Sequence, residues 1–252
     1  MKLVNQSILI TGASSGIGRE LARQLVPRNK LILVARRFDL LENFLQSLPA
    51  KVQNQQSIFQ CDVTHSEEVA QLFTHLRHKE ITVDVAILNA GTSRQFQVQE
   101  LSLKNIKETF DVNFWGALYF IDQLLPTMMK RNRGLIAVTG SLAGYRGMPA
   151  AAPYSASKAA LGVFLESLRI DLIKNGVKLC LISPGFVDTP MIKKKNIPRL
   201  FVLPVEKAAQ KIIKGLEKEK TEIHFPYRLS LPAKFGKLLP NQFYAHLMHG
   251  RH

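Results

Sequence analysis

A glycine-rich turn near the start of the chain constrains its fold more than any other feature. Residues 11–18 read TGASSGIG and directly follow the apolar run 8–10. Three glycines between a strand and a helix allow a tight turn and let the backbone approach a pyrophosphate, which the amides of the helix N-terminus then hold. Such turns also occur for steric reasons alone. Here a helical apolar pattern and a strand-like run at 31–35 follow, and this order predicts a dinucleotide site.

Strand-like runs alternate with helical patterns along the chain. This alternation predicts an α/β fold of the Rossmann-type, doubly wound kind: a mostly seven-stranded parallel sheet with helices on both faces and a ligand crevice at the carboxyl ends of the strands. No linker or repeat divides the 252 residues, so we expect a single domain at 1–252, with a lid at about 186–204 and a C-terminal tail extension at about 226–252. The predicted strands span 7–10, 31–35, 57–61, 83–88, 135–139, 177–183 and 222–225.

Two arginines, Arg36 and Arg37, follow the second predicted strand. An NAD-binding protein places an acidic residue here, about twenty residues beyond the glycine turn, for the ribose 2′-hydroxyl. Two guanidinium groups instead suit a 2′-phosphate, because they form charge-assisted and bidentate hydrogen bonds. The pair therefore predicts NADP(H) rather than NAD(H).

Tyr154 and Lys158 are separated by one turn at the head of a predicted helix. The i, i+4 spacing stacks both side chains on one face. A phenol titrates at about 10 in isolation, and a neighbouring ammonium stabilises its ionised form, which favours proton transfer near neutral pH. Ser141 follows the strand at 135–139, so its hydroxyl lies where a ligand carbonyl could accept a hydrogen bond. Together with the glycine turn, these residues predict a catalytic site.

From residue 3 to about residue 190 the chain resembles the short-chain dehydrogenase/reductase family. The resemblance implies that Asn113, Ser141, Tyr154 and Lys158 are catalytic, with Asn113 holding a water that links Lys158 to solvent. It also implies a cofactor-binding set that includes Tyr154 and Lys158 together with Gly12, Ser14, Ser15, Gly16, Ile17, Gly18, Arg36, Arg37, Asp62, Val63, Asn89, Ala90, Gly91, Pro184, Gly185, Val187 and Thr189.

The chain departs from the family's pattern at two positions. Leu88 stands where the family commonly has asparagine, and Gly140 stands where it often has a second serine. We expect the first departure to alter hydrogen bonding behind the cofactor. We expect the second to widen the space near the reacting carbon.

The resemblance implies an NADP(H)-dependent oxidoreductase that interconverts a carbonyl and a secondary alcohol. Tyr154 would act as general acid and base, Ser141 would stabilise the substrate oxygen, and Lys158 would lower the pKa of the phenol. Apolar residues in the lid, with Lys193, Lys194 and Lys195 at its edge, favour a hydrophobic or lipid-like substrate. The alternative is a catalytically silent protein that binds NADP as a sensor or interaction partner.

The net charge of +15 lies almost entirely in the second half of the chain, where residues 127–252 hold 21 Lys/Arg against 7 Asp/Glu. Such a surface favours an anionic partner, either a membrane, an acidic carrier protein, a phosphorylated substrate or nucleic acid, and it also fits a solvated face with no partner. The sequence contains no recognisable nucleic-acid-binding module, so we expect no nucleic acid as a partner. The cationic stripe on the helix after the lid is formed by Lys207, Lys211, Lys214 and Lys218.

The tail is rich in apolar residues, with Pro226, Pro232 and Pro240 as expected helix breakers. It could lie on an anionic membrane surface, cover the substrate cleft or cover a partner subunit. The resemblance implies a homo-oligomer, either a dimer or a tetramer.

Both cysteines, Cys61 and Cys180, lie in strand-like apolar segments, so we expect buried free thiols and neither a disulfide nor a metal site. The N-terminus leaves no room for a secretory signal, and no apolar run has the length needed to span a bilayer. These observations predict a cytoplasmic protein, with association at a membrane surface as an option.

Overall fold

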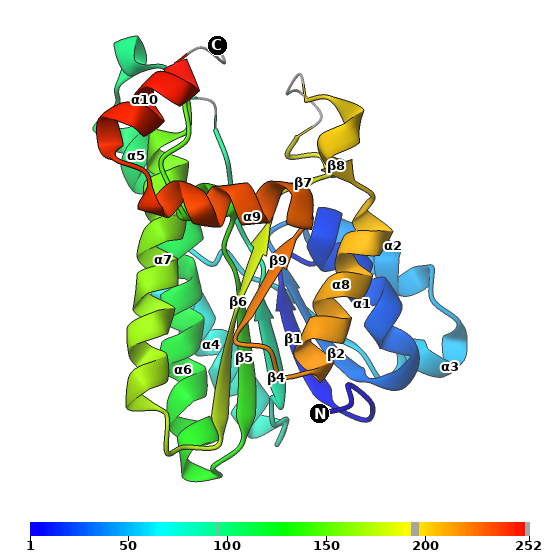
Figure 1. Ribbon diagram of the computed structural model, residues 1–252. Coiled ribbons are helices and arrows are strands. Elements are labelled where there is room, and N and C mark those ends of the chain that lie inside the picture. The colour runs from blue at the N-terminus through cyan, green and yellow to red at the C-terminus, as the bar shows by residue number, and fades with distance from the viewer. Residues whose placement is uncertain (95, 193–196, 250–252) are drawn as a thin grey trace.

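A seven-stranded parallel sheet forms the centre of the molecule (Figure 1). The computed structural model describes residues 1–94, 96–192 and 197–249. The strand order is β3-β2-β1-β4-β5-β6-β9. The strands are β1 (Ser7–Thr11), β2 (Lys30–Ala35), β3 (Ser57–Gln60), β4 (Val85–Leu88), β5 (Gly134–Thr139), β6 (Val177–Pro184) and β9 (Glu222–Phe225). The predicted Rossmann-type fold and its seven strands are confirmed, with strand ends that differ by two residues at most.

Helices cover both faces of this sheet (Figure 1). Successive strand residues point to opposite faces, so Ile8 and Ile10 join one core while Leu9 joins the other. Both faces are buried, which explains the nearly continuous apolar runs of the strands. The first core lies under α1 (Gly16–Leu25), α2 (Phe38–Gln46) and α8 (Val205–Glu217), and the second lies under α4 (Ser66–His78), α6 (Gly116–Lys130) and α7 (Ala152–Asp171).

The direction of winding reverses between β1 and β4, which are neighbours in the sheet. From β1 the chain passes to β2 and β3, whereas from β4 it passes to β5, β6 and β9. A ligand crevice forms at the carboxyl ends of the strands at such a switch point. The remaining elements before the lid are η1 (Val26–Arg28), α3 (Ala50–Gln53), η2 (Val98–Glu100), α5 (Leu103–Phe110), the π-helical turn η3 (Asp111–Trp115) and η4 (Leu142–Gly144).

The region predicted to form a lid, 186–204, contains the short strands β7 (Phe186–Val187) and β8 (Val202–Leu203), which pair in parallel, and the turn η5 (Arg199–Phe201). The basic cluster predicted at Lys193, Lys194 and Lys195 lies outside the described residues. After the lid, α8 exposes Lys207, Lys211 and Lys214 on the face opposite its buried residues. The predicted amphipathic helix is therefore confirmed.

The tail forms α9 (Tyr227–Phe235), η6 (Gly236–Leu238) and α10 (Asn241–His249), which cross above the carboxyl ends of the strands (Figure 1). Pro232 lies inside α9, so the prediction that it breaks the helix is wrong. A proline removes one backbone hydrogen bond. Contacts with β9 hold α9 in place on both sides of the proline, since His224 Nδ1 lies 2.8 Å from Ser230 Oγ and Lys234 Nζ lies 2.5 Å from Glu222 Oε2.

Cys61 and Cys180 are buried free thiols, as predicted. Burial raises the pKa of both to about 12, so both thiols are protonated at neutral pH. Within the part of the chain that the structure describes, none of the helices combines the length and the apolar character that crossing a bilayer requires.

Candidate active site

The glycine turn lies at the carboxyl end of β1 and leads into α1. Gly12 and Gly16 adopt left-handed backbone conformations, with φ of +66° and +56°, which L side chains rarely adopt. A Cβ on Gly18 would lie 2.4 Å from the carbonyl oxygen of Gly12. The turn can therefore close only with glycine at these positions, and it leaves the N-terminal amides of α1 at the crevice.

Next to this turn, the residues that follow β4 form hydrogen bonds with the last residue of β1. The hydroxyl Oγ1 of Thr11 accepts hydrogen bonds from the amides of Asn89 (2.9 Å) and Ala90 (3.0 Å). A Cβ on Gly91 would lie 3.2 Å from Asn113 Oδ1, so the backbone passes close to the π-helical turn. Small residues thus keep a narrow passage open along the sheet.

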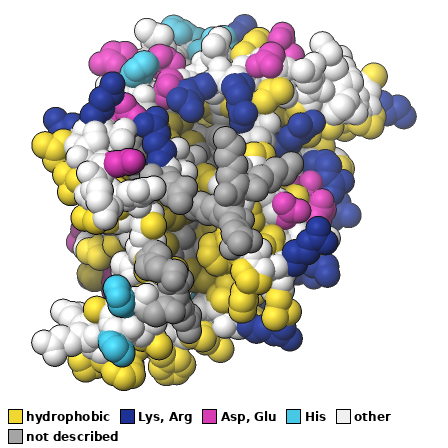
Figure 2. Space-filling model, turned by 90° about the horizontal axis from the view of Figure 1, so that it is seen from above, with side chains coloured by type: hydrophobic (Ala, Val, Ile, Leu, Met, Phe, Trp, Pro, Cys, Tyr) yellow, Lys and Arg dark blue, Asp and Glu magenta, His cyan; other side chains and the backbone are white. Residues whose placement is uncertain are grey.

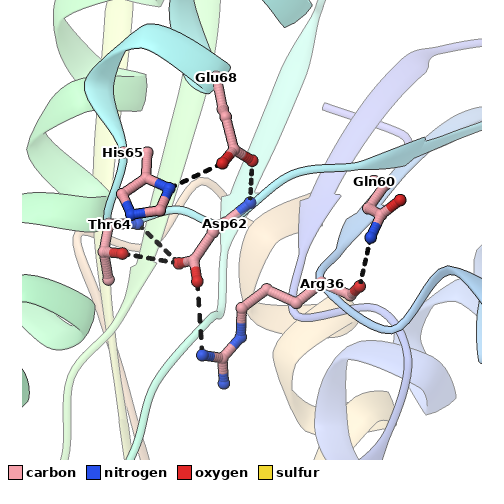
Figure 3. Close-up of polar contacts among 6 residues, drawn as sticks. All are labelled: Arg36, Gln60, Asp62, Thr64, His65 and Glu68. Atoms are coloured by element: carbon pink, nitrogen blue, oxygen red, sulfur yellow. Dashed lines mark hydrogen bonds and ion pairs between the residues drawn. The ribbon is translucent and has the colours of Figure 1, made fainter.

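The two arginines after β2 have different partners. Arg37 Nη2 donates to the hydroxyls of Ser14 (3.0 Å) and Ser15 (2.8 Å), so its guanidinium lies against the glycine turn. Arg36 Nη1 lies 3.5 Å from Asp62 Oδ2 (Figure 3). The structure therefore places the Arg37 guanidinium on the glycine turn and the Arg36 guanidinium beside the carboxylate of Asp62.

Asp62 is held in one orientation by the start of α4 (Figure 3). Its Oδ1 accepts hydrogen bonds from the amide (3.0 Å) and the hydroxyl (2.8 Å) of Thr64, while its own amide donates to Glu68 Oε2 (2.7 Å). Burial acts to raise the pKa of Asp62, but the hydrogen bonds from Thr64 and the charge of Arg36 outweigh it, so the pKa lies below its ordinary value. Asp62 is an ionised acceptor at neutral pH.

The four predicted catalytic residues come from three neighbouring segments. Ser141 follows β5 and begins η4, while Tyr154 and Lys158 lie in the first turns of α7. Lys158 Nζ donates to the carbonyl oxygen of Thr139 at 2.6 Å. Asn113 is buried in η3 and donates to the carbonyl of Thr92 (3.0 Å) and to Ser157 Oγ (3.1 Å). The π-helical turn thus packs Asn113 against α7, the helix that carries Lys158.

Burial governs the titration of the central pair. It raises the pKa of Tyr154, and the Ser141 hydroxyl acts in the opposite direction. Burial also lowers the pKa of Lys158 to about 8, so the ammonium form predominates at neutral pH and is lost as the pH rises above that value. The predicted lowering of the Tyr154 pKa by Lys158 is not seen: the pKa of Tyr154 lies above its ordinary value, because burial outweighs the hydrogen bond with Ser141.

The two departures from the family pattern have structural explanations. Leu88 is buried in the sheet, at 3% exposure. A Cβ on Gly140 would lie 2.8 Å from Leu181 Cδ1. The expected effects of the two departures, on hydrogen bonding behind the cofactor and on the space near the reacting carbon, stay predictions.

A single cavity of about 1140 Å³ joins the glycine turn to Tyr154. Gly18 and Asn113 lie behind its wall, where one closes the turn and the other contacts α7. Every other residue of the predicted site lines it: Gly12, Ser14, Ser15, Gly16, Ile17, Arg36, Arg37, Asp62, Val63, Asn89, Ala90, Gly91, Ser141, Tyr154, Lys158, Pro184, Gly185, Val187 and Thr189.

Sequence reasoning missed a second group of lining residues. They come from the loop after η4 and from the tail, and they include Arg146, Met148, Leu229, Pro232 and Tyr244. The apolar composition of the tail indicated that part of it is buried. It did not indicate that the tail lines the cavity.

The fold and the cavity define an α/β protein with a dinucleotide-type crevice. A family model described as short chain dehydrogenase matches residues 6–199. The chain therefore belongs to the short chain dehydrogenase family and is an oxidoreductase.

Relatives and solved structures agree with this family. The chain is 33% identical over 240 residues to an uncharacterized oxidoreductase of Myxococcus xanthus, with 95% of this chain and 94% of the relative covered. It is 37% identical over 188 residues to bovine (Bos taurus) retinol dehydrogenase 8, with 73% of this chain and 60% of the relative covered. A short chain dehydrogenase from Burkholderia cenocepacia in complex with NADP superposes with a TM-score of 0.83, at 25% identity and with 98% and 99% of the two chains covered. Solved neighbours include complexes with NADP and with NAD.

Proposed function

We propose that the protein is an NADP(H)-dependent oxidoreductase that interconverts a carbonyl and a secondary alcohol, on a hydrophobic or lipid-like substrate. One observation carries the proposal: Ser141, Tyr154 and Lys158 line the same cavity as the glycine turn. The NADP complex of the Burkholderia cenocepacia neighbour supports the cofactor class.

The residues at the crevice fit a nicotinamide dinucleotide. The left-handed glycines leave no side chain at Gly12 and Gly16, and the N-terminal amides of α1 would face a pyrophosphate. Gly12, Ser14, Ser15, Gly16, Ile17 and Gly18 would form that cradle, and Asp62 with Val63 would border the adenine. When bound, the cofactor supplies or accepts a hydride.

The chain's own residues handle the proton and the oxygen. Ser141 donates a hydrogen bond to the substrate oxygen, and Tyr154 delivers a proton to that oxygen as negative charge develops on it. Lys158, held by the Thr139 carbonyl, provides positive charge on the same face of α7. Asn113, fixed by Thr92 and Ser157, supports a water-mediated route for the proton to solvent.

A carbonyl panel tests this function. We expect the purified protein to oxidise NADPH when it is given methyl ketones of increasing chain length, and the absorbance of NADPH measures the rate. The KM should be lower for the longer ketones. NADH is expected to be the poorer reductant, because the crevice carries Arg36 and Arg37. Tight NADPH binding without turnover of any ketone, aldehyde or reverse-direction alcohol would instead support the catalytically silent sensor.

We further propose peripheral contact of the tail with an anionic membrane surface. The outward side chains of Phe235, Leu238 and Phe243 are 68%, 81% and 58% exposed. Lys237 adds positive charge beside them. Hydrophobic and basic side chains surround the hollowed face seen in Figure 2. Apolar area and cationic charge together favour an interfacial location.

Sedimentation with vesicles checks this contact. We expect the protein to pellet with phosphatidylserine-containing vesicles at low salt and to be released at high salt, since the attraction is screened. A Phe235→Ser/Leu238→Ser variant should pellet far less. Equal sedimentation with purely zwitterionic vesicles, or none with anionic ones, would remove the proposal.

A further inference from the structure

The tail closes the cavity above the candidate catalytic residues. Its helices contribute apolar side chains to the wall, among them Leu229, Pro232 and Leu247. Other apolar side chains of the lining include Met148 and Phe186. A chain extending from a carbonyl beside Tyr154 would therefore run along an apolar surface that the tail helps to form.

Arg146 makes several contacts that anchor this tail. The guanidinium of Arg146 donates to the carbonyl oxygens of Gly236 and Leu239 and, at 2.8 Å, to Asn241 Oδ1. It also lies 4.3 Å from the centre of the Tyr244 ring. Gly236 is the residue at which α9 ends, and its carbonyl also accepts a hydrogen bond from the Leu239 amide at 3.3 Å, while Leu239 follows η6. A cation at the C-terminal end of α9 interacts favourably with the helix dipole.

The loop that carries Arg146 is itself fixed to the catalytic helix. Its Met148 amide donates to Ser155 Oγ at 3.2 Å, and Tyr244 Oη donates to the Gly147 carbonyl at 2.7 Å. Just before the loop, a Cβ on Gly144 would lie 2.9 Å from the backbone of Lys158, so η4 packs directly on α7. Arg146 thus joins the tail to the segment between Ser141 and Tyr154.

We propose that Arg146 is a positioning residue that holds the tail over the cavity and thereby gives the enzyme its preference for carbonyl substrates with a long apolar chain. The hydrogen bonds from its guanidinium are directed to the tail, so its role is to hold this wall in place. A long chain gains contact with the tail, whereas a short ketone beside Tyr154 does not reach it. The claim that the held tail gives a preference for long apolar chains rests on the proposed reductase function. The claim that Arg146 holds the tail does not.

Three variants separate these claims. Arg146→Leu replaces the guanidinium with an apolar side chain and removes all donors, whereas Arg146→Lys keeps the charge but replaces the planar fork of donors with one ammonium group. Arg133→Leu is the matched control, because Arg133 is exposed at the turn before β5, at the opposite end of the sheet from the cavity. Amide hydrogen exchange over residues 227–249 reports anchoring without any turnover. Fluorescence titration with dansylated undecanoic acid reports binding of an apolar chain, also without turnover.

In Arg146→Leu we expect exchange of the tail amides to accelerate and affinity for the dansylated probe to fall about tenfold, with Arg133→Leu unchanged. The KM for methyl undecyl ketone should rise by a similar factor, while kcat/KM for butanone stays within about twofold. Arg146→Lys should lie between wild type and Arg146→Leu.

Unchanged tail exchange in Arg146→Leu would overturn the anchoring. Accelerated exchange with unchanged probe affinity and unchanged ketone selectivity would overturn the link to substrate preference. If the wild type binds NADPH but reduces neither ketone, the proposed function fails, and the exchange and probe measurements still decide whether Arg146 holds an apolar wall.

Discussion

A Tyr154→Phe variant is expected to reduce ketones about two to four orders of magnitude more slowly than wild type, which is the contribution of a positioned general acid. The phenol lies in the cavity beside Ser141, and burial raises its pKa, so it carries its proton at neutral pH. Phenylalanine keeps the ring and removes only the hydroxyl. Affinity for NADPH should therefore stay within about twofold, since the loss falls on the chemical step. Stopped-flow measurement of single-turnover NADPH oxidation checks this directly.

The control for that variant is Tyr119→Phe. Tyr119 lies on α6 and stacks on Trp115 at 6.3 Å between ring centres, outside the cavity lining. It should react at the wild-type rate. An unchanged single-turnover rate in Tyr154→Phe with normal NADPH binding would end the assignment of Tyr154 as the proton donor.

Replacing both Arg36 and Arg37 by alanine should weaken NADPH binding by at least about a hundredfold while changing NADH binding little. Hydrogen bonds to charged groups contribute about 1.5–3 kcal/mol each, and two are lost here. Arg37 lies against the glycine turn through Ser14 and Ser15, and Arg36 faces Asp62 across the same end of the cavity. Titration of each variant with both cofactors, followed by protein fluorescence or calorimetry, measures the change.

The single variants apportion the effect between the two arginines. Arg37→Ala should lose more affinity for NADPH than Arg36→Ala, because the Arg36 side chain is 67% exposed and forms an ion pair with Asp62. Arg133→Ala, remote from the cavity, is the matched control. A parallel loss for NADPH and NADH would mean that the arginines support the turn and do not read a 2′-phosphate.

Local patterns in the sequence determined the sheet and the residues at its crevice. The glycines of the turn, the alternating apolar runs and the Tyr154–Lys158 spacing each reflect geometry over a few residues, such as a positive φ, a strand period or a helical turn. Parallel strands then bring their carboxyl ends to one edge, so segments as distant as Gly12 and Tyr154 could be placed in one cavity before any coordinates.

Only the tertiary structure decided what the tail covers. Its apolar composition was equally compatible with a membrane, a partner subunit or the cleft. Composition indicates that a surface is buried, but it does not indicate which surface covers it. The contacts of Arg146 with Gly236, Leu239 and Asn241 span 90 to 95 residues in the chain and follow no local period. Pro232 remains helical because side-chain contacts with the preceding strand β9 hold α9 in place, and the residue type of a proline does not predict such contacts.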